Sequence, residues 1–87
     1  MKLKDGFLLR RVAGENVALP VGGSLDPNMM ITLNGTGAFL WERLAAETDT
    51  DTLVAAVLEA YDDVDEALAR RAVEDFLETL RGYGFLE

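Results

Sequence analysis

The side chains able to do chemistry in this 87-residue chain are almost all carboxylates. The sequence has 16 Asp and Glu residues, no His and no Cys. The usual zinc ligands, thiol nucleophiles, Ser–His pairs and disulfides are therefore excluded. We expect no catalytic residues, no metal site and no cofactor, and so a protein that is not an enzyme.

The carboxylates cluster where helices are expected to begin or end. Acidic side chains at helix N-termini complement the helix dipole, which explains several of them without any binding role. Residues 62–65 superficially resemble a calcium loop but lack its central Gly and terminal Glu. Gly22-Gly23-Ser24 is not followed by a Lys at phosphate-loop spacing. No pair of carboxylates is marked as an acid–base pair.

The charge is unevenly distributed along the chain. The formal net charge is −8, and residues 35–87 hold four Arg against thirteen Asp and Glu. Such an acidic segment repels phosphate, so we expect no nucleic-acid partner. The N-terminus is too interrupted by charge for a signal peptide, and no apolar stretch is long enough for a membrane span. We therefore expect a cytoplasmic protein without a membrane partner.

The first third of the chain has the pattern of β-strands. Residues 7–12 and 16–19 are rich in Leu and Val, and the turn-rich residues 13–16 between them predict a hairpin. Pro20 cannot donate to a ladder, so it should lie at a strand end. After a Gly-rich loop, residues 29–33 predict a third, short strand.

The first two helices are predicted from apolar spacings of three and four residues. Asn34 or Thr36 can cap a helix that runs to about Ala46. A second helix should follow the polar connector at residues 48–51 and end at Asp62-Asp63.

The third helix is the longest. We expect it from about Glu66 to Arg81, with Asp65 as its N-cap and Gly82 as its left-handed end. The apolar tail at residues 83–86 should pack back on the body. Three strands followed by three helices predict an α+β fold over residues 1–87, a single domain with a small antiparallel sheet and helices on one side.

The third strand is the first candidate binding element. Residues 29–33 carry no charge and no proline, and a three-stranded sheet has two open edges. Such a strand suits β-augmentation, in which a peptide adds as an extra strand. The simpler explanation is that this strand only packs the core. The candidate contact residues here are Met29, Met30, Ile31, Thr32 and Leu33.

The third helix is the second candidate element, because its apolar arc is wider than a minimal core stripe. On a helical wheel, Leu68, Ala72 and Thr79 lie on one flank of this arc beside Arg71 and Asp75. The small Ala72 would leave space for a ligand side chain. The alternative is that every apolar residue of this helix belongs to the core.

Four segments, in this order, resemble PqqD-like proteins. Residues 30–41, with Asn34 after Leu33 and Trp41 at the end, resemble the family's entry into its first helix. Residues 52–54 resemble the start of its second helix. Residues 60–65 resemble its Tyr-Asp-Val-Asp connector, and residues 73–86 its C-terminal pattern. The resemblance extends over nearly the whole chain.

The resemblance implies a winged-helix-like fold and a non-catalytic recognition element for ribosomally made precursor peptides. In this family the leader segment of the precursor adds to the third strand and lies in a groove against the third helix. The domain presents it to a modifying enzyme, often a radical S-adenosylmethionine (radical SAM) protein, or to a leader peptidase in lasso-peptide systems. The contact residues implied by position are residues 29–33, while Leu68, Arg71, Ala72 and Asp75 follow from the helical wheel alone.

Two departures from the family pattern concern the identity of the precursor. Asp62-Asp63 lengthens the connector by one residue, and residues 24–30 differ from members of the pyrroloquinoline quinone pathway. We therefore expect a precursor from another pathway. Two alternatives remain open at this point: a winged-helix DNA-binding regulator, which the acidic helical segment disfavours, and a homodimer formed by edge-to-edge strand pairing.

Overall fold

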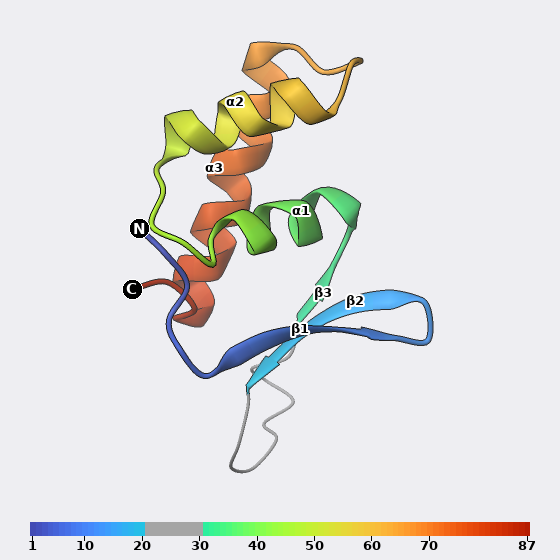
Figure 1. The fold of residues 1–87 in the computed structure, drawn as a ribbon, viewed down its shortest axis with the longest axis vertical. Coiled ribbons are helices and arrows are strands. Elements are labelled where there is room, and N and C mark those ends of the chain that lie inside the picture. The colour runs from blue at the N-terminus through green and yellow to red at the C-terminus, as the bar shows by residue number, and fades with distance from the viewer. Residues whose placement is uncertain (21–30) are drawn as a thin grey trace.

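The computed structural model describes residues 1–20 and 31–87, and within them three strands are followed by three helices (Figure 1). The elements are β1 (Phe7–Val12), β2 (Glu15–Pro20), β3 (Ile31–Leu33), α1 (Gly35–Arg43), α2 (Thr50–Ala60) and α3 (Glu66–Tyr83). The strands form one antiparallel sheet in the order β1-β2-β3, and the helices lie on one side of it. The predicted α+β architecture is confirmed.

A two-residue turn joins β1 to β2. Ala13 and Gly14 have φ values of 52° and 82°. Positive φ at both central positions gives a primed turn, whose twist matches that of the flanking strands. The turn is shorter than predicted because Glu15 already pairs with Val12. At the other end of the hairpin Pro20 is the last residue of β2, as the sequence predicts.

The third strand pairs with β2 alone among the described residues. The antiparallel register runs from Ala18↔Ile31 to Asn16↔Leu33. Because β2 occupies the centre of the sheet, β3 forms one of its edges. Met29 and Met30, which the sequence assigns to the same strand, lie outside the described residues.

Each helix begins at a side chain that accepts a hydrogen bond from a backbone N–H three residues later. The pairs are Asn34 with Gly37 at 2.7 Å, Asp49 with Thr52 at 2.8 Å, and Asp65 with Leu68 at 2.8 Å. Such caps satisfy N–H groups that have no partner inside the helix. For Asp49, the hydrogen bonds from Thr52 lower the pKa of the carboxyl below its ordinary value.

The first helix ends at Arg43, earlier than the predicted end at Ala46. The reason is an interaction with the N-terminal segment. The Leu44 carbonyl accepts a hydrogen bond of 2.9 Å from the Leu3 N–H, and the Thr48 N–H donates at 2.9 Å to the Met1 carbonyl. Backbone groups that would extend the helix are therefore used to hold the N-terminal segment.

The third helix ends one residue before Gly84, not at Gly82 as predicted. Gly84 has φ +78°, and its N–H donates to the Arg81 carbonyl at 3.0 Å. The Phe85 N–H donates to the Leu80 carbonyl at 2.9 Å, which completes a Schellman motif. Both glycines permit a left-handed turn, but only a turn at Gly84 directs Phe85 into the core.

The core joins the sheet to the helices through the ring of Phe85, which is fully buried. Its centroid lies 4.5 Å from that of Phe7 on β1 and 5.7 Å from that of Trp41 on α1. The next residue, Leu86, forms an isolated antiparallel bridge with Leu3, so the two chain ends lie close together (Figure 1). The C-terminal tail therefore packs on the body, as predicted.

Loss of the α3 cap should destabilise the domain measurably. Asp65→Ala removes the side-chain acceptor for the Leu68 N–H, and we expect the free energy of unfolding to fall by about 1 kcal/mol. Urea denaturation followed by circular dichroism measures this change. Asp63→Ala, which removes the same charge from the same connector outside the cap position, is the matched control. Equal losses in both variants would contradict the assigned cap.

Candidate functional site

A groove lies between β3, the first turns of α1 and one face of α3. It consists of two adjoining hollows with volumes of about 390 and 320 Å³. Four residues border both hollows, namely Asn34, Gly37, Phe76 and Thr79. The first hollow is completed by Ile31, Thr32, Leu33 and Tyr83, and the second by Thr36, Leu40, Ala72 and Asp75. The groove is therefore continuous from the edge strand to the start of α1.

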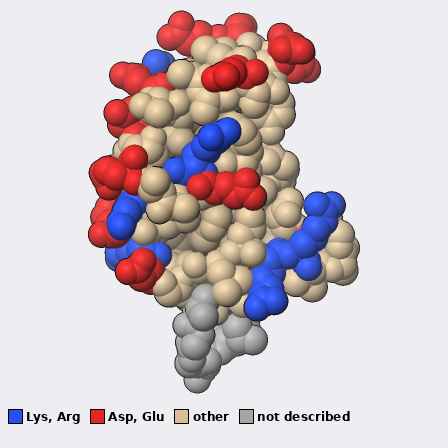
Figure 2. All heavy atoms as spheres, viewed as in Figure 1, with Lys and Arg blue, Asp and Glu red and all other residues tan. Residues whose placement is uncertain are grey.

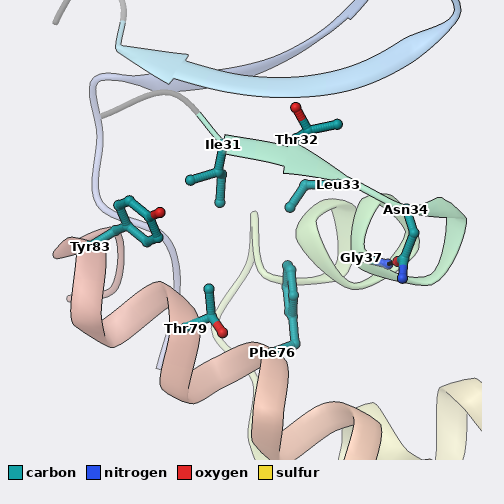
Figure 3. A pocket seen from close by; sticks show the side chains of 8 residues that line it. All are labelled: Ile31, Thr32, Leu33, Asn34, Gly37, Phe76, Thr79 and Tyr83. Atoms are coloured by element: carbon teal, nitrogen blue, oxygen red, sulfur yellow. Dashed lines mark hydrogen bonds between the residues drawn. The ribbon is translucent and has the colours of Figure 1, made fainter. Parts of the chain in front are cut away.

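The first hollow is lined by apolar side chains from two elements. Figure 3 shows Ile31 and Leu33 pointing from β3 toward α3, where Phe76 and Tyr83 point back toward the strand. Thr32 points the other way, as the alternation of a strand requires. An edge strand thus borders an apolar hollow that is open to solvent.

Gly37 on α1 lies close to both β3 and α3 within the groove. A Cβ atom at this position would lie 3.2 Å from Asn34 Oδ1, 3.3 Å from Leu33 Cβ and 3.3 Å from Phe76 Cε1. Those separations are tight for a real side chain, so only glycine leaves the Phe76 ring where it is. A glycine has low helix propensity in the first turn of α1, but at this position it helps to shape the groove.

The α3 wall of the groove follows a simple helical repeat. Ala72, Phe76, Thr79 and Tyr83 are separated by four, three and four residues, so they share one face. Phe76 is half-buried and Tyr83 is 41% exposed. Phe76 packs against the core and also lines the groove, and neither it nor Tyr83 is among the site residues selected from the sequence. The same repeat, continued from Ala72, places both aromatic residues on the helix face that was selected from the sequence.

The structure brings most of the residues selected from the sequence into this groove. Ile31, Thr32 and Leu33 border the first hollow, while Ala72 and Asp75 border the second.

Two of the selected residues lie elsewhere. Leu68 and Arg71 border a separate hollow at the start of α3, with Asp65 and Ala67. Leu68 is 56% exposed and lies one turn before Ala72 on the same side of the helix. The residues selected on the helical wheel thus divide between the groove and this separate hollow, one turn nearer the start of α3.

The charges lie mostly away from the groove. Figure 2 shows carboxylates over the end of the molecule formed by α2 and the start of α3 and along one flank. Basic side chains lie over the β1–β2 hairpin, which carries Arg10 and Arg11, and also among the carboxylates. Among the residues that border the two hollows, Asp75 is the one with a charged side chain. The groove is thus chiefly an apolar and backbone surface with a single carboxylate.

The described part of the chain offers no group of three or more Asp or Glu side chains arranged to hold a metal ion. None of the helices in the same ranges combines the length and hydropathy needed to cross a membrane.

Comparison with known families identifies the class of protein. The sequence model of the family described as "Coenzyme PQQ synthesis protein D (PqqD)" matches residues 15–86. The match covers both β2 and β3 and all three helices, hence the whole groove. The chain belongs to the PqqD family, as its motifs indicate. A comparison with curated protein sequences finds no match.

A solved structure with a similar fold is "TbiB1 in Complex with the TbiA(beta) Leader Peptide". The two chains share 26% sequence identity with a TM-score of 0.76, and the alignment covers 100% of this chain and 95% of the other. The similarity thus extends over the complete arrangement of three strands and three helices.

Proposed function

We propose that this protein is a non-catalytic adaptor that captures the leader segment of a ribosomally made precursor peptide. The leader adds as a strand to the edge of β3 opposite β2 and lies in the groove against α3. The observation that carries the proposal is the apolar groove beside an edge strand, in a PqqD-family chain similar to a protein solved with a leader peptide.

The groove has two means of holding a peptide. The edge of β3 opposite β2 offers backbone groups that can pair with any extended chain, and each hydrogen bond formed contributes about 0.5–1.5 kcal/mol. Every second peptide side chain then faces α3. An apolar side chain buried between Ile31, Phe76 and Tyr83 contributes about 1.5–3 kcal/mol. The edge provides general affinity, and the hollows select the peptide.

The contact set extends the selection made from the sequence. We propose Met29 to Leu33 as the contact strand, with Ala72 and Asp75 on α3, to which the geometry adds Phe76, Thr79 and Tyr83. Leu68 and Arg71 would be reached by a longer peptide that continues one turn beyond Ala72.

The adaptor itself does no chemistry in this proposal and needs no cofactor. It acts in the cytoplasm as one domain over residues 1–87. Its second partner is a modifying enzyme, such as a radical SAM protein or a leader peptidase, which receives the bound precursor. Pairing of two β3 edges in a homodimer would compete with the peptide for the same backbone groups.

A DNA-binding regulator has less support. A docking helix needs Lys and Arg free to contact phosphate. The α3 helix carries four carboxylates against three Arg. Of these Arg residues, Arg70 is paired, with Nη1 3.0 Å from Asp51 and Nη2 3.7 Å from Glu66.

The direct test is a titration of ¹⁵N-labelled protein with the short peptides encoded beside its gene. We expect saturable amide shifts centred on β3 and on the Ala72–Tyr83 face of α3. Shifts confined to the hairpin or to α2 would leave an adaptor with a different site. Failure of every candidate peptide to bind would remove the proposal.

Strand addition predicts a period of two in the peptide backbone. In an added edge strand, every second N–H points toward β3 and the others point to solvent. Methylating the backbone nitrogens of a binding peptide one at a time should therefore weaken binding at alternate positions, measured as Kd by fluorescence anisotropy. A flat or irregular profile would be inconsistent with strand addition and would favour docking by side chains alone.

Filling the second hollow should reduce peptide affinity without unfolding the domain. Ala72 borders the hollow and is half-buried, so Ala72→Leu places three extra carbons in the space for a peptide side chain. We expect Kd to rise about tenfold, the loss of about 1.4 kcal/mol. Ala55→Leu, at an exposed position of α2 that borders neither hollow, is the control and should leave Kd unchanged. Equal affinity of both variants would exclude Ala72 from the contact.

A further inference from the structure

The second hollow of the groove has a carboxylate at its border, and the first has none. Asp75, from α3, is exposed at its border, and the other residues that line it are uncharged. In the described part of the chain, the ion pairs within 4 Å are Met1–Glu47, Lys2–Glu87, Arg70–Asp51 and Arg70–Glu66, so the Asp75 carboxylate is not among them. A carboxylate only accepts hydrogen bonds, and here it remains available to a ligand.

The polar groups beside Asp75 are partly committed within the protein. The Thr79 hydroxyl donates to the Asp75 carbonyl at 3.0 Å, and the Asn34 side-chain oxygen accepts from the Gly37 N–H. The positive end of the α1 dipole also lies at this hollow, but it amounts to about half a unit charge and offsets only part of the carboxylate.

The other charged side chains near Asp75 do not cancel its negative charge. Glu74 and Glu78 flank it on α3. Arg71, one turn earlier, borders the separate hollow at the start of α3 together with Leu68. The chain as a whole has a net charge of −8, so its field attracts a cationic ligand and repels an anionic one.

We propose that the peptide bound in this groove has a Lys or Arg whose side chain pairs with Asp75, at a fixed distance from an apolar residue that fills the first hollow. This inference rests on the proposed function and adds the chemistry of the ligand to it. Asp75 is thereby a specificity-determining residue, and the apolar residues of the groove supply the remaining affinity.

The geometry also gives the spacing. Phe76 and Thr79 of α3 border both hollows, Tyr83 borders only the first, and Ala72 and Asp75 border only the second. Along α3 the two hollows are therefore offset by about one helical turn, about 5.4 Å. Successive peptide side chains on one side of a strand are two residues apart, about 6.6 Å. The basic residue therefore lies two positions from the apolar one.

The order of these two residues reports the direction of the peptide. Along the chain, β3 passes from the first hollow toward Asn34 and the second. A peptide antiparallel to β3 has its basic residue before the apolar one, and a parallel peptide has it after.

The test is a selection of displayed random 12-residue peptides against the intact 87-residue protein and two variants. Asp75→Lys reverses the charge in the groove. Glu74→Lys makes the same change on the same helix, at an exposed position that borders neither hollow. We expect the wild type and Glu74→Lys to enrich Lys or Arg two positions from an apolar residue, and Asp75→Lys to enrich Asp or Glu there.

Affinities of one selected peptide complete the test. Replacing its basic residue by Gln should raise Kd about fivefold for the wild type and leave it unchanged for Asp75→Asn. Enrichment of apolar peptides with no basic preference, or the same preference in Asp75→Lys, would overturn this inference and leave the peptide-binding function standing. A wild-type protein that enriches no peptide would overturn both.

Discussion

The position of α3 relative to the sheet depends on the burial of Phe85. Its ring contacts Phe7 from β1, Trp41 from α1 and Tyr83 from α3, the last at 5.6 Å between centroids. The left-handed turn at Gly84 is what brings Phe85 to this place. Because interiors are packed to crystal-like density, these contacts fix the helix against the strands to within small displacements. The width of the groove is set in the core and not at its surface.

A rigid width matters because strand addition and side-chain selection must work together. A peptide held by the edge of β3 has its side chains at fixed positions, so the opposite wall must lie at the right distance from all of them. Gly37 lets α1 approach Phe76 without displacing its ring. Asn34 caps α1 beside the same point. The elements β3, α1 and α3 thus meet where the two hollows join. Their contact holds the α3 wall at a fixed distance from the β3 edge.

The sequence alone predicted the elements well because local chemistry determines them. The caps at Asn34 and Asp65 and the hairpin all follow from residue type and spacing. The end of α3 did not, since Gly82 and Gly84 are equivalent locally and only the burial of Phe85 distinguishes them. Phe76, which packs against the core, was not selected as a groove residue for a related reason. A half-buried aromatic residue beside a groove has the same helical periodicity as one in the core, and only the tertiary arrangement separates the two.

In the proposed binding mode, general affinity for a peptide and selection among peptides depend on different groups of the groove. Hydrogen bonding along β3 uses the backbone and is indifferent to side-chain identity, whereas Asp75, Thr79 and Tyr83 are exposed residues of α3. Exposed positions tolerate substitution with little cost to folding. In the proposed binding mode, changes on a single helical face would exchange one peptide preference for another, while the β3 edge and the core that sets the spacing remain the same. Such an adaptor can diversify along with its ligand.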